Sequence, residues 1–180
     1  MIRIMMALAG LLLLAACAGR APQAAQGVEI APVAAPALEL MNLGHPRTDV
    51  YTSGRIAATD VAQLQAAGVR HVIDLTAPAE TPDFDEAAVL HAAGIAYDNL
   101  PIAGADALTR ENVVAFDALL REAGRPLLVH CASSNRVGAM AALRAAWIDG
   151  KPAGDAIAEG RAWGMTSLED AVRERLESGH

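Results

Sequence analysis

One short segment of the chain places a cysteine and an arginine at a spacing that suits nucleophilic chemistry on an anion. Cys131 directly follows the strand-like run 126–130, and Arg136 lies five positions after it. A thiolate is a strong nucleophile, and a guanidinium binds a tetrahedral oxyanion through two parallel hydrogen bonds. A helix that begins near Arg136 would add unpaired N–H groups and the positive end of its dipole, which bind anions and stabilise a thiolate. We therefore expect a nucleophile inside an anion cradle, against the competing interpretation of a buried structural thiol beside a surface arginine.

The rest of the chain alternates between segments of strand and helix character. Strands are predicted for the short apolar runs 50–56, 70–75, 95–102 and 126–130. Helices are predicted, from apolar spacing and terminal signals, at 60–67, 83–94, 110–123, 136–149, 152–163 and from 166 onward. This alternation predicts an α/β fold with a mostly parallel central sheet flanked by helices. Because ligands bind at the carboxyl ends of parallel strands, the position of Cys131 suits a site.

Three of the helix starts carry capping residues. Asp83 with Glu86, and Thr166 with Glu169, have the spacing of capping boxes, in which two side chains bond reciprocally to the backbone of the first turn. Thr109 has the residue type and position of a simple N-cap. These signals predict where the helices begin.

Composition and charge exclude several classes of protein. The chain of 180 residues has a net charge of −7, and Lys151 is the single lysine among 14 basic residues. It therefore lacks the clustered positive charge that a nucleic-acid partner requires. Two cysteines exclude a disulfide-rich scaffold, and His45, His71 and His91 share no metal-ligand spacing. We expect no nucleic acid, no metal and no cofactor.

The first 17 residues predict export. Arg3 precedes an uncharged apolar run, 4–14, which has the length of a signal-peptide core and is too short for a membrane span. The run ends in Leu14-Ala15-Ala16-Cys17, which resembles the bacterial lipobox. This resemblance implies cleavage before Cys17 and lipidation of Cys17, with the bacterial membrane as a partner. Ala18, where inner-membrane lipoproteins carry Asp, implies the outer membrane and a domain that faces the periplasm.

These features divide the chain into a lipoprotein signal peptide (1–16), a lipidated, Ala/Pro-rich tether (17–40) and a folded domain (41–180). The tether lacks a sustained hydrophobic period, and it would hold the domain off the membrane surface. The alternative is that residues 28–40 pack on the domain as an extended arm.

Several motifs together are similar to one known group of proteins. They are Tyr51-Thr52-Ser53-Gly54, the run 67–75, the run 94–102, and Val129-His130-Cys131 with the downstream Arg136 and Gly138. The chain resembles the cysteine-dependent phosphatases with the dual-specificity fold. More narrowly, residues 50–147 resemble the bacterial phosphatase-like domain that also occurs fused to metallo-β-lactamase-like hydrolases. The resemblance implies a dual-specificity-phosphatase-like fold and the hydrolysis of phosphate monoesters.

The resemblance also implies roles for single residues. Cys131 would attack phosphorus and form a cysteinyl-phosphate, and Arg136 would hold the phosphoryl oxygens. Asp106 matches by position the acid that protonates the leaving oxygen, while Asp74 either fixes a loop by hydrogen bonds or is the reserve acid. The substrate loop would comprise His130, which orients it and favours the thiolate, and the backbone N–H groups of Ala132, Ser133, Ser134, Asn135 and Arg136. The implied partner is a phosphorylated protein, including phosphotyrosine, or a small phosphate ester.

The loop departs from the broad phosphatase pattern in three respects. Four residues instead of five separate the cysteine from the arginine, and Val137 stands where the pattern has Ser or Thr. The mid-loop glycine is absent, so we expect Asn135 to adopt the left-handed backbone conformation, and Ser133 or Ser134 to supply the missing hydroxyl. The shorter loop is also the length found in rhodanese-type sulfurtransferases. Persulfide transfer by the same cysteine and phosphate binding without turnover are therefore the alternative functions.

Overall fold

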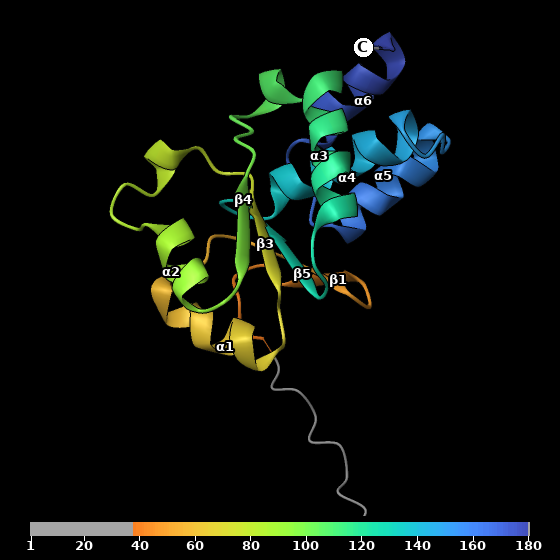
Figure 1. Ribbon diagram of the computed structural model, residues 1–180. Coiled ribbons are helices and arrows are strands. Elements are labelled where there is room, and N and C mark those ends of the chain that lie inside the picture. Colours follow the sequence, from red (N-terminus) through yellow and green to blue (C-terminus); the bar gives the residue numbers. More distant parts are fainter. Residues whose placement is uncertain (1–37, 180) are drawn as a thin grey trace, which may run out of the picture. The chain divides into compact units, whose positions relative to one another are not determined.

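A five-stranded sheet forms the centre of the domain in the computed structural model, which describes residues 38–179 (Figure 1). Its strands are β1 (Gly44–Arg47), β2 (Val50–Ser53), β3 (His71–Asp74), β4 (Ala96–Asn99) and β5 (Leu127–His130). The spatial order is β1-β2-β5-β3-β4. The strands β2, β5, β3 and β4 pair in parallel, and β1 pairs antiparallel with β2 at the edge. The predicted, mostly parallel sheet is confirmed, although the sequence analysis missed β1.

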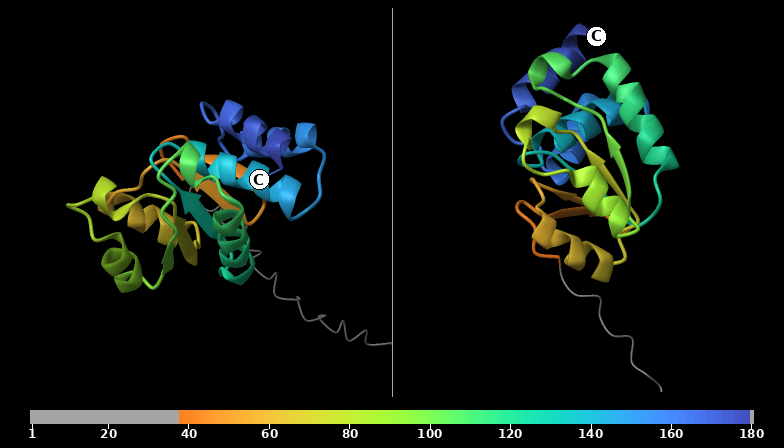
Figure 2. Two further views of the ribbon diagram at one scale, coloured as in Figure 1. Left: turned by 90° about the horizontal axis from the view of Figure 1, so that it is seen from above. Right: turned by 60° about the vertical axis from the view of Figure 1, so that its left-hand side comes forward.

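Helices cover both faces of this sheet, as predicted (Figures 1 and 2). They are α1 (Val61–Ala66), α2 (Glu86–Ala92), α3 (Arg110–Glu122), α4 (Asn135–Trp147), α5 (Ala153–Ala162) and α6 (Glu169–Ser178). The short 3₁₀ turns are η1 (Ala58–Asp60), η2 (Pro78–Glu80) and η3 (Ala105–Ala107). The helices α1 and α2 lie on one face, while α3 to α6 lie on the other.

The alternation of side chains along β5 divides the core into two layers. Leu127 and Val129 are buried with residues of α3 to α6, whereas Leu128 is buried with residues of α1 and α2. Since successive strand residues point to opposite faces, His130 points toward α2, and Cys131 joins the core cluster on the α3–α6 side. The alternation of side chains thus places His130 and Cys131 on opposite faces of the sheet.

Helices α4 and α5 approach each other closely through two glycines. A Cβ atom at Gly138 would overlap the backbone nitrogen of Met165, and one at Gly160 would lie 2.7 Å from the Cβ of Ala142. Both positions therefore exclude larger side chains. This packing fixes the position of α4, the helix that begins four residues after Cys131.

Two of the three predicted helix starts need correction. Thr109 caps α3 as predicted, because its hydroxyl accepts a hydrogen bond from the N–H of Asn112. The cap of α2 is Asp85 instead of Asp83, and Glu86 is the first helical residue. At α6 the Thr166 side chain makes no cap, and Leu168 is the capping residue. The prediction was wrong there because the expected partner carboxylates bind other side chains: Glu86 binds His130, and Glu169 binds Arg161 and Arg173.

The folded domain begins earlier than predicted. Leu38 and Leu40, which we placed in the tether, pack against the apolar cluster of α1 and α2, and Leu38 is buried. The predicted signal peptide, lipidation site Cys17 and most of the tether lie outside the described residues. Within residues 38–179, no helix has both the length and the apolar character needed to cross a membrane.

Candidate active site

Four loops meet at one edge of the sheet, where the parallel strands end. The registers place the last residues of β2, β3 and β4 beside one another through β5: Ser53 and Asp74 both pair with His130, and Asp74 also pairs with Asn99. The chain segments that follow these strands therefore surround the segment that follows β5. The predicted nucleophile loop, from His130 to Arg136, begins at the end of β5, and Asp106 lies in the segment that follows β4.

The nucleophile loop runs from Cys131 to the start of α4. The thiol of Cys131 is unpaired and its side chain is buried. Ser134 has a left-handed backbone (φ 68°), so the assignment of this conformation to Asn135 was wrong. A left-handed residue at a turn aims successive N–H groups inward as an anion-binding nest. Within the described part of the chain, no acceptor binds the N–H groups from Ala132 to Arg136, which leaves them available to an oxyanion.

Contacts with the segment between α5 and α6 hold this loop in place. The Ser134 hydroxyl donates to the carbonyl of Trp163 at 3.1 Å. Gly164 has φ 100° and lies so close to Ser134 that any Cβ would collide with it. The side-chain oxygen of Asn135 accepts from the N–H of Thr166 at 2.8 Å. The side chains of Ser134 and Asn135 thus serve the structure, and only their backbone N–H groups fit the predicted cradle role.

Arg136 is oriented so that one edge of its guanidinium remains unpaired. Its Nη1 and Nη2 donate to the two carboxylate oxygens of Glu80, each at 2.7 Å. Nη1 also donates to the carbonyl of Ile102 at 2.8 Å and to that of Leu75 at 3.3 Å. No acceptor among residues 38–179 binds Nε or the second hydrogen of Nη2, which together form the side-on fork. This fork matches two oxygens of a phosphoryl group.

Charge interactions secure the pair of Arg136 and Glu80. The pKa of Glu80 falls from 4.5 to about 2, chiefly because its carboxylate accepts hydrogen bonds from Arg136. The pKa of Arg136 is raised, first by the hydrogen bonds to Glu80 and further by the nearby sulfur of Cys131, against the effect of burial. Both groups are therefore charged at neutral pH, and the guanidinium lies beside the predicted nucleophile.

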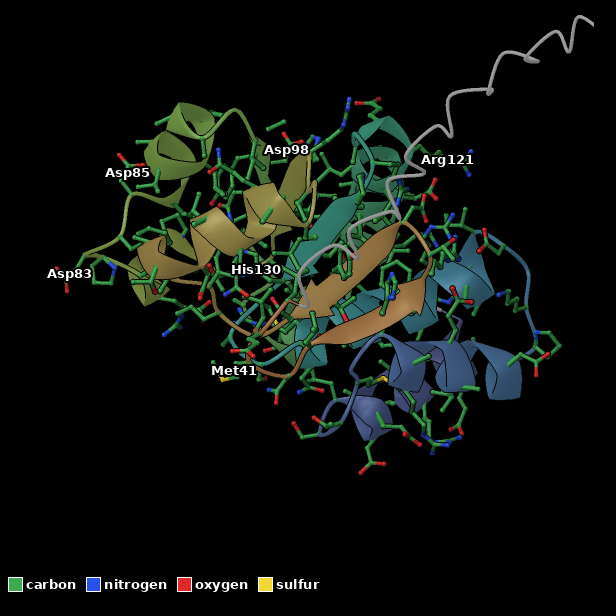
Figure 3. The ribbon with its side chains drawn as sticks, turned by 90° about the horizontal axis from the view of Figure 1, so that it is seen from below. Met41, Asp83, Asp85, Asp98, Arg121 and His130 are labelled. Atoms are coloured by element: carbon green, nitrogen blue, oxygen red, sulfur yellow. The ribbon has the colours of Figure 1, made fainter. Side chains whose placement is uncertain are left out.

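His130 lies on the opposite side of the nucleophile loop, in a buried polar cluster. Its Nε2 is 2.7 Å from Oε1 of Glu86, and both side chains are buried (Figure 3 labels His130). Asp74 lies 3.6 Å from the same nitrogen. The carboxylate of Asp74 accepts hydrogen bonds from Thr76, Tyr97 and Asn99, so the loop-fixing interpretation of Asp74 is confirmed. The His130 ring is fully buried and its polar contacts are with Glu86 and Asp74, so its role in orienting the loop stays a prediction.

The same cluster is the one group of possible metal ligands among residues 38–179. Donor atoms of Asp74, Glu86 and His130 lie within 4.8 Å of one another. Two ligands of one zinc ion, each at about 2.0–2.2 Å in a tetrahedral arrangement, lie at least about 3 Å apart. The separation of 2.7 Å between His130 and Glu86 is instead that of a hydrogen bond. The donor set therefore fits a shared proton better than a metal ion.

Asp106 lies in η3, in the loop that follows β4. Its side chain is exposed and forms no hydrogen bond or ion pair with the described residues. The loop is fixed on both sides of it, because Arg136 binds the carbonyl of Ile102 and Asn112 binds that of Ala107. Asp106 thus belongs to the same loop cluster as Cys131, and its role as the acid stays a prediction.

Val137, at the position where the phosphatase pattern has Ser or Thr, has no hydroxyl, and its side chain is buried in the core. Of the two serines named above, Ser134 uses its hydroxyl to bind Trp163. The side chain of Ser133 is exposed, and in the structure as described it donates no hydrogen bond. Ser133 is therefore the loop hydroxyl that remains available.

A hollow of about 360 Å³ adjoins the cradle. Its lining comes from the loops after β2 and β3 and consists of Arg55, Ile56, Ala57, Ala58, Glu80, Thr81, Pro82, Asp83 and Phe84. Glu80 links the hollow to Arg136, and the N–H of Arg55 donates to the carbonyl of Ala132 at 3.3 Å.

Two functional candidates were missed by the sequence analysis, Glu80 and Glu86. Each acts through a residue far away in the chain: Glu80 binds Arg136 across 56 positions, and Glu86 binds His130 across 44. The sequence marked Glu86 only as part of a predicted capping box. It does lie at the start of α2, but its side chain binds His130 instead of the backbone of the helix. For Glu80 the sequence carries no signal beyond an acid in a Pro-containing loop.

Comparison with known proteins agrees with this geometry. The family model described as "Beta-lactamase hydrolase-like protein, phosphatase-like domain" matches residues 45–148. A candidate phosphatase of Neisseria meningitidis Z2491 is 23% identical, with a TM-score of 0.65 over 78% of this chain and 99% of that one. P. aeruginosa TpbA is 25% identical, with a TM-score of 0.58 over 77% of this chain and 84% of that one. None of the curated proteins matches the chain.

The fold is therefore that of the dual-specificity phosphatases. Within it, the chain belongs to the family of phosphatase-like domains of beta-lactamase hydrolase-like proteins. It is a phosphatase-like hydrolase.

Proposed function

We propose that this protein hydrolyses phosphate monoesters through a cysteinyl-phosphate on Cys131. The observation that carries the proposal is the convergence of three features on one loop. They are the buried thiol, the unpaired N–H groups from Ala132 to Arg136 and the side-on fork of Arg136. Donors that are fixed in advance stabilise the charge of a transferring phosphoryl group without reorganisation.

The reaction has two steps. The Cys131 thiolate attacks phosphorus, the bond from phosphorus to the ester oxygen breaks, and Asp106 gives a proton to the leaving alcohol. Water then attacks the phosphoryl group, the sulfur–phosphorus bond breaks, and the carboxylate of Asp106 takes the proton of the water. Inorganic phosphate leaves, and the thiolate and the acid are restored. Without a hydroxyl at Val137, the second step depends on Ser133 or on water alone.

The proposed substrate is a phosphorylated protein or a small phosphate ester, with phosphotyrosine as the leading candidate. One similar structure, a variant of P. aeruginosa TpbA in which a serine replaces a cysteine, is a complex with pTyr. It is 25% identical, with a TM-score of 0.53 over 77% of this chain and 92% of that one. The hollow offers the apolar surfaces of Pro82 and Phe84 to an aromatic leaving group.

Wild-type protein and the Cys131→Ser variant distinguish the possible functions. We expect release of phosphate from p-nitrophenyl phosphate by the wild type and none by the variant. Production of thiocyanate from thiosulfate and cyanide, or of sulfide from thiosulfate and a thiol, would instead support sulfur transfer. Tight binding of vanadate without either product would indicate a phosphate-binding protein. Equal turnover by the two proteins would refute a role for Cys131.

We also propose that the mature protein is exported and anchored through lipid on Cys17, at the outer membrane and facing the periplasm. The support is the lipobox-like sequence and the apolar run before it. Metabolic labelling with a radioactive fatty acid should mark the wild type and not a Cys17→Ser variant. Labelling of both would refute the site, and detection of the protein in the cytoplasmic fraction would refute export.

A further inference from the structure

The hollow of about 360 Å³ beside the cradle contains one basic side chain, that of Arg55, among the residues that line it. Arg55 follows β2, and its backbone is tied to the nucleophile loop: its N–H donates to the carbonyl of Ala132, and Gly54 forms a bridge with Ser133. The backbone of Arg55 therefore lies beside the nucleophile loop, and its guanidinium lies next to Glu80. A charge at that position faces the part of a substrate that lies next to the phosphoryl group.

The hydrogen-bond donors of the Arg55 guanidinium are unused. It donates no hydrogen bond to any of residues 38–179, and its side chain is 42% exposed. Its nearest carboxylate oxygen, Oε2 of Glu80, lies 3.7 Å away, beyond hydrogen-bond distance. That carboxylate is already held at 2.7 Å by Arg136. Glu80 is thus shared: Arg136 holds it through hydrogen bonds, and Arg55 forms a looser ion pair with it that leaves the donors of Arg55 unused.

The other walls of the hollow set the remaining character of the ligand. Ile56 is buried, and Pro82 and Phe84 add apolar surface. Asp83 also lines the hollow, and its exposed side chain points outward from the loop (Figure 3). The hollow thus combines an apolar wall with one cationic side chain, that of Arg55.

From this arrangement we infer that Arg55 is a specificity-determining residue. It recognises a second anionic group next to an aromatic phosphate ester, such as an acidic residue that neighbours a phosphotyrosine. This inference rests on the proposed function and names the substrate class of the same site. Because the arginine is partly exposed, its preference is moderate, about 2- to 5-fold in affinity, and it weakens with salt.

Binding of two phosphotyrosine peptides to the Cys131→Ser variant tests the inference without requiring turnover. The peptides are identical except that one has Glu and the other Gln beside the phosphotyrosine. Titration calorimetry at low salt should give a Kd about 2- to 5-fold lower for the acidic peptide. Adding Arg55→Ala should bring the ratio of the two Kd values to about 1, and Arg55→Glu should invert it.

Arg70→Ala is the matched control, because Arg70 is exposed and lies at the other end of β3 from the site. That change should leave the ratio as it is in the parent. An unchanged ratio in Arg55→Ala would overturn the inference, and so would equal binding of the two peptides by the parent. Failure of the proposed function is recognised separately, by the absence of phosphate release from p-nitrophenyl phosphate by the wild type.

Discussion

The ion pair between Glu80 and Arg136 makes a quantitative prediction about stability. Glu80→Gln keeps the shape of the side chain but removes the charge that binds the guanidinium through two hydrogen bonds of 2.7 Å. We expect the variant to be less stable at neutral pH. We also expect it to bind vanadate more weakly, because Arg136 loses the contact that directs its free edge toward the cradle.

The pKa of Glu80 gives the magnitude. A fall from 4.5 to about 2, at 1.36 kcal/mol for each pKa unit, sets an upper limit of about 3 kcal/mol. Since 29% of the Glu80 side chain is exposed, solvent screening reduces this to about 1–2 kcal/mol. A carboxyl whose folded pKa is depressed stabilises the protein above its unfolded pKa. That contribution is lost as the pH falls from 4.5 through about 2.

Urea unfolding, followed by the fluorescence of Trp147 and Trp163, measures this difference. At pH 7 the free energies of unfolding of wild type and Glu80→Gln should differ by about 1–2 kcal/mol. Below about pH 2 they should converge, because a protonated glutamate resembles glutamine. Glu122→Gln, at an exposed position without an ion pair in the described structure, should show no such difference. A gap between wild type and Glu80→Gln that does not change with pH would refute the reasoning.

Three further changes probe the packing, the buried cluster and the acid. Gly138→Ala should lower the free energy of unfolding by about 1–3 kcal/mol, because the new methyl group meets the backbone of Met165. Glu86→Ala should cost about 1–3 kcal/mol in urea unfolding, because it removes the hydrogen-bond partner of a buried His130 ring nitrogen. Asp106→Asn should slow turnover by about 10²- to 10⁴-fold for alkyl phosphates, and by less for p-nitrophenyl phosphate, whose leaving group needs little protonation.

Each of these predictions has a control or a contrary outcome. Gly154→Ala, where a Cβ meets open space, should stabilise the protein by about 0.5–1 kcal/mol. An equal loss of stability at both glycines would contradict the packing argument. Glu86→Gln retains an acceptor for His130, so a loss as large as that of Glu86→Ala would mean that the hydrogen bond is not the cause. Equal slowing of good and poor leaving groups would exclude Asp106 as the acid.

Local patterns predicted the part of the site that is local in the chain. The buried strand β5, the turn after it and the start of α4 follow from one continuous segment, so the positions of Cys131 and Arg136 could be predicted. The edge strand β1 was missed because its four residues (GHPR) are not apolar, include a proline and are only half-buried or exposed.

The residues that support the site could not be predicted, because their partners depend on the tertiary structure. Asn135 has the better intrinsic tendency for a left-handed backbone, yet Ser134 adopts it, since its hydroxyl binds Trp163 and Gly164 leaves room for it. Glu86 has the spacing of a capping residue, but the alternation of side chains along β5 points His130 toward α2, where it contacts Glu86. Helix-start rules describe only the first turn and contain no information on such long-range contacts.

The contacts of Ser134 and Asn135 with the segment between α5 and α6 have a consequence for what counts as the smallest working unit. The family match ends at residue 148, whereas Trp163 and Thr166, which hold the nucleophile loop, lie beyond it. A fragment cut at the family boundary would keep Cys131 and Arg136 and lose the groups that shape the loop between them. The segment beyond that boundary thus fixes the geometry of the proposed catalytic loop, although it contributes no reacting atom to the proposed reaction.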